Sequence, residues 1–262
     1  GVLVRAGHTE ASVDMAKICG LQSSAVICEI MNSDGTMARL KDCEKFAKKH
    51  KIKIATIADL IGYRLKKDSL VEKVADCQLP THMTNFKCYA YDSLIDGKTH
   101  IALIKGKISK TKPTLVRVHS ECLTGDLFGS LRCDCGSQLH SALEMISNEE
   151  SGVLLYLAQE GRGIGLANKM RAYHLQNIGF DTVDANHRLG FEDDERDLEI
   201  AAKILKSLGV SNIKLMTNNP KKIELLTENG ITVKERVPLI VSMNPNNENY
   251  LKTKAKKSGH LL

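Results

Sequence analysis

Residues 152–179, GVLLYLAQEGRGIGLANKMRAYHLQNIG, decide the fold class predicted for this chain. The apolar run 152–157 has the length of a buried strand, and the segment 166–179 predicts a helix that ends at Gly179. The alternation continues outside this stretch, with helices predicted over 137–146, 195–209 and 219–229 and strands over 213–217 and 231–239. We therefore expect an α/β fold in which mixed sheets are covered by helices.

The N-terminal part of the chain shows the same alternation and then loses it. Strands are predicted over 1–7, 25–31 and 52–57, and helices over 10–20 and 43–50. Residues 63–80 are charged and weakly patterned, which is typical of a linker. Because the chain opens inside a predicted strand, without an initiator Met, we expect residues 1–64 to be part of a larger domain and residues 65–262 to form a second domain.

The composition is that of an ordinary globular protein. With 262 residues, 42% of them hydrophobic and 26% charged, the chain can bury a substantial core. No apolar run approaches the roughly 18 residues of a membrane span, and no export leader opens the chain. Single cysteines scattered through helix-like and strand-like stretches indicate reduced, cytosolic usage, so we expect a cytoplasmic protein without a membrane partner.

The net charge of +6 is concentrated near the C-terminus. The tail KTKAKKSGH contains no acid and holds Lys252, Lys254, Lys256 and Lys257, which predicts a solvated end. Aromatic residues make up 4% of the chain and tryptophan is absent, so few side chains are available to stack on bases. We therefore expect no nucleic-acid partner.

Three cysteines gather in the stretch ECLTGDLFGSLRCDC, as Cys122, Cys133 and Cys135. Structural zinc sites are closed by four protein ligands, whereas catalytic zinc keeps three and leaves the fourth position for water. The spacing alone leaves both interpretations open, because His119, His140 or a distant cysteine would complete a structural site.

The glycine-rich segment QEGRGIGLANK follows a predicted strand and opens a predicted helix. It resembles a dinucleotide-binding fingerprint, with Asp181 and Asp184 at the expected distance, but Leu166 stands where the third glycine is needed. Backbone N–H groups at a helix N-terminus still favour phosphate, and Arg162 adds a bidentate donor. A plain turn is the alternative.

Two further clusters have the chemistry of a nucleotide site. FEDDERD places acids at the start of a predicted helix, and NNPKK places Lys221 and Lys222 in the first turn of another, where anions collect in α/β sheets. Each cluster on its own is also typical of a structural helix start.

Taken in order along the chain, these motifs resemble GTP cyclohydrolase II of riboflavin biosynthesis. The resemblance covers roughly residues 70–262 and is carried by RVHSECLTGDLFGSLRCDCGSQL, QEGRGIGLANK, DANHRLGFEDDERD, TNNPKK and VPLIVSMNPNNENYL. It implies zinc-dependent hydrolysis of GTP to 2,5-diamino-6-(5-phosphoribosylamino)pyrimidin-4(3H)-one, formate and diphosphate. The implied zinc ligands are Cys122, Cys133 and Cys135; we expect magnesium to accompany the triphosphate and the protein to be a homodimer.

The resemblance also implies roles for individual residues. Asp194 matches a proton acceptor and Arg196 a nucleophile toward the α-phosphate, although an arginine pKa above about 12 suits Arg196 better to stabilising phosphate charge. Contacts to GTP are implied for Arg117, Val118, His119, Ser120, Glu121, Gln138, Glu160, Gly161, Arg162, Thr182, Thr217 and Lys222.

The N-terminal part carries a second resemblance, to 3,4-dihydroxy-2-butanone 4-phosphate synthase. VRAGHTEASVDMAKICGL, AVICEIMNSDGTMARL and KIATIADLIGYR match the C-terminal part of that family over residues 1–64, as in a bifunctional riboflavin biosynthesis protein lacking its N-terminus. The family acts on ribulose 5-phosphate with magnesium or manganese. The resemblance implies a substrate-binding run, a metal ligand at His8 and an essential carboxylate at Glu29; the run comprises Arg5, Ala6, Gly7, His8 and Thr9. We expect this part to be inactive because the family's acidic metal-binding loop is absent from the chain.

Two alternatives come from other classes of protein. A structural-zinc protein that binds nucleic acid through its basic tail predicts a fourth metal ligand. A GTP-binding regulator without catalysis predicts loss of the cysteines or of Asp194 and Arg196, all of which are present.

Overall fold

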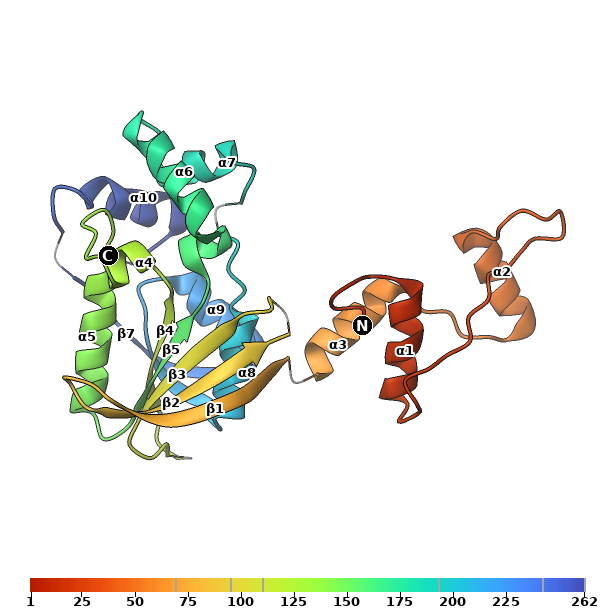
Figure 1. The fold of residues 1–262 in the computed structure, drawn as a ribbon, viewed down its shortest axis with the longest axis horizontal. Coiled ribbons are helices and arrows are strands. Elements are labelled where there is room, and N and C mark those ends of the chain that lie inside the picture. Colours follow the sequence, from red (N-terminus) through yellow and green to blue (C-terminus); the bar gives the residue numbers. More distant parts are fainter. Residues whose placement is uncertain (69, 95, 110, 193, 242, 262) are drawn as a thin grey trace. The chain divides into compact units, whose positions relative to one another are not determined.

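The computed structural model describes residues 1–68, 70–94, 96–109, 111–192, 194–241 and 243–261. The chain divides into two units, residues 1–70 and 71–262, each with its own internal contacts. The predicted α/β class is confirmed, because the second unit combines a mixed sheet with helices (Figure 1). Among the described helices, none has both the length and the apolar character needed to cross a bilayer.

The first unit is built from helices α1 (His8–Ile18), α2 (Leu40–His50) and α3 (Ile57–Lys67). Helix α3 begins where the Thr56 hydroxyl accepts the N–H of Asp59 at 3.0 Å, an N-cap. Arg64 of α3 donates to the buried Asp14 carboxylate of α1 at 2.7 Å, and the backbone N–H of Val2 donates to the same oxygen at 2.7 Å. A buried ion pair therefore joins α1 to α3.

The strands predicted for the first unit are wrong. Segments 1–7, 25–31 and 52–57 form no strand in the described chain, where Met31 and Met37 make only an isolated bridge. A strand persists only where a neighbour satisfies its backbone N–H and C=O groups, and among the described residues the pairing of these segments is limited to the contact of Ile30 and Met31 with Met37 and Ala38. Val26, in the middle of one apolar run, is fully exposed.

The second unit contains a seven-stranded sheet in the order β1-β2-β3-β5-β4-β6-β7. Its strands are β1 (Val71–Pro80), β2 (Asn85–Ser93), β3 (Thr99–Lys105), β4 (Thr114–Ser120), β5 (Gly152–Leu157), β6 (Asn212–Met216) and β7 (Thr232–Val237). Pairing is antiparallel from β1 to β5 and parallel from β5 through β4 and β6 to β7. The predicted linker 63–80 is wrong, because its second half is the edge strand β1, exposed on both faces beyond Val71.

The helices of the second unit are α4 (Leu123–Asp126), α5 (Cys135–Asn148), α6 (Gly165–Asn177), α7 (Thr182–Arg188), α8 (Glu199–Ser207), α9 (Pro220–Glu228) and α10 (Glu248–Ser258), with a short 3-10 turn at Glu160–Gly163. Helices were predicted at the positions of α5, α6, α8 and α9, whereas α4, α7 and α10 were not predicted. The predicted solvated tail is correct for Lys252 and Lys256, which are exposed, and wrong for Lys254 of α10, which is only 8% exposed.

The sheet is covered on both faces (Figure 1). Val116 and Val118 of β4 pack into the core that contains α8 and α9, whereas Leu115 and Leu154 pack against Ile146 of α5. Because side chains alternate along β4, one face of the strand packs against α8 and α9 and the other against α5. Arg117 and His119 lie on the same face of β4 as Leu115, toward the carboxyl end of the strand.

Candidate functional site

A pocket opens beyond the carboxyl ends of β4, β5 and β6, where ligands bind in open α/β sheets. It contains about 1100 Å³ of space, part of it continuous with solvent. Ser120 follows from β4, Glu160 from β5 and Thr217 from β6, and α5, α6 and α10 supply further lining residues. Parallel pairing thus brings residues that are far apart in sequence to one edge of the sheet.

The three cysteines lie together in this pocket. Cys122 precedes α4, while Cys133 and Cys135 lie at the start of α5. Their sulfur atoms are all within 4.8 Å of one another, and Cys122 Sγ is 3.7 Å from Cys133 Sγ. Zinc–thiolate bonds of about 2.3 Å in tetrahedral geometry require sulfur–sulfur distances of about 3.8 Å, so the thiols have the spacing of a metal site.

Glycine at position 125 makes this approach of the thiols feasible. A Cβ atom there would lie 2.9 Å from Cys133 Sγ and 3.1 Å from Cys122 Sγ. Gly136 faces it from α5, where a Cβ would collide with the carbonyl oxygen of Gly125. The two glycines therefore allow α4 and α5 to meet with the thiols between them.

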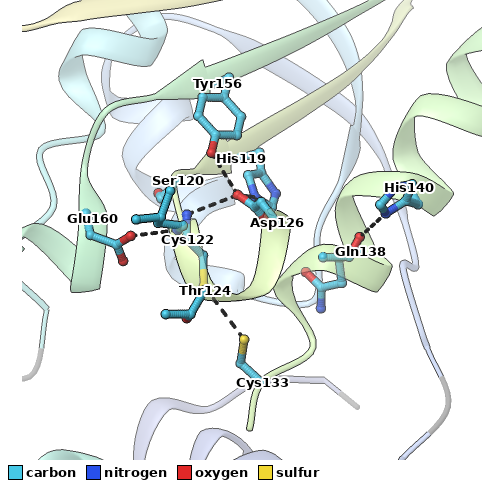
Figure 2. A network of polar contacts seen from close by, with 12 residues as sticks. His119, Ser120, Cys122, Thr124, Asp126, Cys133, Gln138, His140, Tyr156 and Glu160 are labelled. Atoms are coloured by element: carbon cyan, nitrogen blue, oxygen red, sulfur yellow. Dashed lines mark hydrogen bonds and ion pairs between the residues drawn. The ribbon is translucent and has the colours of Figure 1, made fainter. Parts of the chain in front are cut away.

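The histidines that were candidates for a fourth ligand are engaged elsewhere. His119 Nε2 lies 3.0 Å from the Asp126 carboxylate, and the exposed His140 has its Nδ1 2.8 Å from the carbonyl oxygen of Gly136. Figure 2 shows Asp126 between His119, Tyr156 and the backbone of Cys122. Within the described residues, the metal-ligating cluster consists of the three cysteines alone.

A buried lysine compensates the charge of the cysteine cluster. Lys169 of α6 donates to Cys122 Sγ at 3.1 Å and to Glu160 Oε1 at 2.8 Å. Hydrogen bonds from the Cys133 and Cys135 thiols, and then the Lys169 ammonium, lower the pKa of Cys122 far below its ordinary value. Cys122 is therefore a thiolate at neutral pH, the form that binds metals.

Basic side chains occupy the other side of the pocket. The buried Arg117 donates to Met216 O at 3.0 Å and to Gln138 Oε1 at 2.6 Å, and the buried Lys222 donates to Val118 O at 2.9 Å. Burial, with repulsion from Arg196 and Arg117, lowers the pKa of Lys222 well below its usual value. An anion placed beside it would favour its charged form.

Asp194 and Arg196 form an ion pair at the rim of the pocket. Arg196 Nε donates to Asp194 Oδ1 at 2.7 Å, and its Nη2 contacts the other carboxylate oxygen. Burial alone would raise the pKa of Asp194, but the hydrogen bonds and charge of Arg196 outweigh it and hold that pKa below its ordinary value. The same pairing raises the pKa of Arg196 against the opposing effect of its burial.

The glycine-rich segment forms a strained turn that holds this rim in place. Gly161 and Arg162 both adopt left-handed backbone angles, with φ of 64° and 61°. The Arg162 carbonyl accepts the N–H of Glu195 at 2.9 Å, and a Cβ at Gly163 would lie 2.7 Å from Glu195 O. A non-glycine residue in the left-handed region costs about 1–3 kcal/mol and is typical of functional sites.

Most of the residues predicted for the site line this one pocket. They are Arg117, His119, Ser120, Glu121, Cys122, Cys133, Cys135, Gln138, Glu160, Gly161, Arg162, Thr182, Arg196, Thr217 and Lys222. Val118 differs, because its side chain is in the core and only its carbonyl oxygen reaches Lys222. Asp194 is not among the lining residues, but it contacts Arg196, which is.

The structure also places residues in the pocket that the sequence analysis missed. They include Lys169 and Tyr173 from α6, and Tyr250, Lys254 and His260 from the C-terminal region. Asp134, between two of the cysteines, is 2% exposed and bonds to Lys254. A carboxylate between two predicted ligands was a signal for a basic partner, but a partner 120 residues away cannot be found from local pattern.

Among the described residues, those singled out in the first unit form no cluster of potential metal ligands. Arg5, Ala6, His8, Thr9 and Glu29 are exposed, and Gly7 is half-buried. Arg5 pairs with Glu10 at 3.3 Å. No hydrogen bond or ion pair between described residues joins His8 to Glu29.

Comparison with known proteins accounts for both units. Residues 72–238 match the GTP cyclohydrolase II family. The chain belongs to that family. Residues 1–63 match 3,4-dihydroxy-2-butanone 4-phosphate synthase, so both families expected from the motifs are confirmed.

Similar proteins align with this chain across both of its family regions. The riboflavin biosynthesis proteins RibBA of Bacillus subtilis (strain 168) and Aquifex aeolicus (strain VF5) are each 57% identical to this chain over 263 residues. The matches cover the whole of this chain but 66% and 65% of those relatives, so it spans slightly less than two thirds of their length. A solved structure of RibBX, described as a two-domain 3,4-dihydroxy-2-butanone 4-phosphate synthase from A. baumannii, is 32% identical with a TM-score of 0.43, covering 92% of this chain and 61% of that one.

Proposed function

We propose that the second unit hydrolyses GTP to 2,5-diamino-6-(5-phosphoribosylamino)pyrimidin-4(3H)-one, formate and diphosphate, the first step of riboflavin biosynthesis. Family membership supports this proposal. The observation that carries it is the convergence, in one pocket, of three clustered thiols and several basic side chains. The thiols suit a hydrolytic metal and the basic groups suit a triphosphate.

Zinc is the cofactor that fits the cysteine cluster best. Three sulfur ligands with this spacing favour zinc over the oxygen-preferring magnesium, and Cys122, Cys133 and Cys135 would hold it. Bound there, the ion supplies Lewis acidity for hydrolysis of the guanine imidazole ring. The three-membered donor set is that of a catalytic rather than a closed structural site, which argues against the structural-zinc alternative.

The remaining side chains divide between holding GTP and moving a proton. Arg162, Arg196 and Lys222 are placed to bind the triphosphate, which we expect to bring magnesium with it. Gln138 retains one free donor and one free acceptor position on its amide for the guanine edge. Asp194 is ionised at neutral pH and is our candidate proton acceptor.

Arg196 acts in this proposal as a charge stabiliser rather than a nucleophile. Its guanidinium is paired with Asp194, which raises its pKa above an already high value. A protonated guanidinium has no lone pair for attack on phosphorus. It can instead donate hydrogen bonds to the phosphate oxygens during loss of diphosphate.

The test is to incubate the chain with GTP and follow formate and the pyrimidine product. Cys133→Ser should abolish ring opening, as chelation of zinc should, because either change removes the metal from the site. Cys77→Ser, an exposed cysteine on β1 outside the pocket, is the matched control and should turn over normally. Full GTP ring-opening activity in a zinc-free preparation would contradict the assignment of zinc.

For the first unit we propose descent from a synthase that acts on ribulose 5-phosphate. The match over residues 1–63 supports the family relationship. Arg5 through Thr9 and Glu29 are the candidate substrate and metal residues of that reaction, which uses magnesium or manganese. Their exposure to solvent does not support activity of the first unit by itself.

A further inference from the structure

Helix α10 contributes a buried lysine to the cysteine side of the pocket. Lys254 Nζ lies 2.8 Å from Asp134 Oδ1, and the two side chains are 10% and 1% exposed. Its ammonium also lies 4.6 Å from the centre of the Tyr250 ring. Removing one partner of a buried charge pair strongly destabilises the folded protein, because the other charge stays buried without compensation.

Asp134 connects this lysine to the residues around it. It lies between Cys133 and Cys135, and its second oxygen accepts from Gln138 Nε2 at 2.6 Å. Gln138 Oε1 in turn accepts from Arg117 at 2.6 Å. Lys254, Asp134, Gln138 and Arg117 therefore form one continuous hydrogen-bonded chain from α10 to β4.

The C-terminal segment that carries Lys254 is held on a second side of the pocket. The N–H of His260 donates to Lys254 O at 3.2 Å, and the N–H of Leu261 donates to Asn218 O at 2.8 Å. Helix α10 also packs against α7. These contacts hold in place the segment that carries Lys254.

We propose that Lys254 is a positioning residue, which holds the Cys133–Cys135 turn and Gln138 in place through Asp134. It neutralises a carboxylate that would otherwise lie buried without compensation between two cysteines, and it fixes the carboxylate that orients Gln138. Partners of this outer kind typically change metal affinity or activity by about 10- to 100-fold when removed. The inference rests on the proposed function only for its effect on turnover.

The test compares Lys254→Met with Lys252→Met in the full chain. Both residues are lysines of α10, but Lys252 is exposed and pairs with Glu248 on the surface. We expect Lys254→Met to lower zinc affinity, measured by competition with a chelator, and kcat for GTP, each by about 10- to 100-fold. Lys252→Met should stay within about twofold of the parent in both.

A second substitution separates positioning from direct binding of GTP. Asp134→Asn, added to Lys254→Met, removes the uncompensated carboxylate and should restore part of the zinc affinity, so the two effects should not add. If Lys254 instead only binds phosphate, Lys254→Met would raise KM, leave zinc affinity unchanged and gain nothing from Asp134→Asn. That result would overturn the proposal.

Folding and the proposed activity are controlled separately. Lys254→Arg keeps the charge, so it should retain more zinc affinity than Lys254→Met. If these two variants both unfold cooperatively and lose zinc affinity equally, that result would also count against positioning. If the parent chain bound zinc but released no formate from GTP, the proposed function would fail, while the chelator titrations would still decide the role of Lys254.

Discussion

Asp194 is the residue whose chemistry is most directly set by one neighbour. Because Arg196 keeps its pKa low, the carboxylate stays ionised as pH falls toward its ordinary range near about 4. We predict that Asp194→Asn lowers kcat by about 100-fold or more while GTP affinity stays within a few-fold, since the phosphate-binding cations remain. Single-turnover kinetics and GTP titration measure the two effects.

The controls for that substitution are Lys222→Ala and Glu192→Gln. Lys222→Ala should mainly weaken GTP binding, because it removes a cation from the pocket. Glu192→Gln changes an exposed acid two residues away and should have little effect. Normal turnover by Asp194→Asn would show that another group accepts the proton.

Gly125 tests the geometry of the cysteine cluster without changing a ligand. An added methyl group would lie 2.9 Å from Cys133 Sγ, closer than Cβ atoms come to other heavy atoms, and a tight 3.1 Å from Cys122 Sγ, so it must push the thiols away. We predict that Gly125→Ala lowers zinc affinity by at least about tenfold, measured by chelator competition. Gly62→Ala, in a helix with no atom near the added Cβ, should leave zinc affinity unchanged; equal behaviour of the two variants would contradict the prediction.

At the scale of elements, local pattern was enough where an element buries one face against the sheet. Helices α5, α8 and α9 followed from apolar spacing, and Asn219 caps α9 as its sequence position indicates. Strands β1 to β4 were not predicted. β1 is largely exposed and β4 is buried along nearly its whole length, so neither shows an alternating pattern, whereas β3 does alternate and its signal was not used. The predicted strands of the first unit failed for the opposite reason, since an apolar run such as 25–31 does not specify a partner.

The candidate site was predictable in composition but not in its supporting contacts. The cysteines and the basic residues were found from motifs and family resemblance, and the structure brings them to one edge of the sheet. Lys169 and Lys254 were missed because each lies on a helix with no local sign of its buried partner. Long-range pairing of this kind depends on tertiary structure, so single-sequence pattern cannot reveal it.

The pairing of β3 with β5 contains a group whose protonation should affect stability. His100 of β3 is fully buried, and its Nδ1 accepts the N–H of Ala158, just beyond β5, at 3.1 Å. Burial lowers the pKa of His100, with partial opposition from Asp96. A lowered histidine pKa contributes stability above the unfolded value near about 6.5, and that contribution is lost as pH falls below it.

We therefore predict that the second unit becomes less stable between pH 7.5 and pH 5. His100 contributes up to about 2 kcal/mol of this loss, the limit set by an unfolded pKa near 6.5. In denaturant unfolding, His100→Asn should show a smaller change with pH, because its amide oxygen can accept the same N–H without titrating. The exposed His82→Asn should keep the parent's pH dependence, and an unchanged slope in His100→Asn would contradict the assignment.

At the scale of the whole molecule, the two units differ in how far they assemble chemistry. The second unit uses parallel strand ends to gather thiols, cations and a carboxylate around one pocket. In the first unit, the buried ion pair of Arg64 with Asp14 joins two helices, while the residues matched to the synthase family remain exposed on separate segments. The same chain thus contains one gathered site and one dispersed set of candidate residues.

Our last prediction is that residues 1–262 release no formate from ribulose 5-phosphate. Enolisation of the sugar requires a metal and charged groups held together around it, and separating them forfeits much of the rate. His8 and Glu29 are both exposed, no hydrogen bond or ion pair between described residues joins them, and a single imidazole is a weak ligand for magnesium. The assay supplies ribulose 5-phosphate with magnesium or manganese and omits GTP, so that ring opening cannot contribute formate. A parallel sample with GTP alone shows that the preparation is active, and a full-length RibBA relative serves as the positive control. Formate released at a rate close to that relative's would mean that the first unit forms its site in solution despite the exposure of these residues.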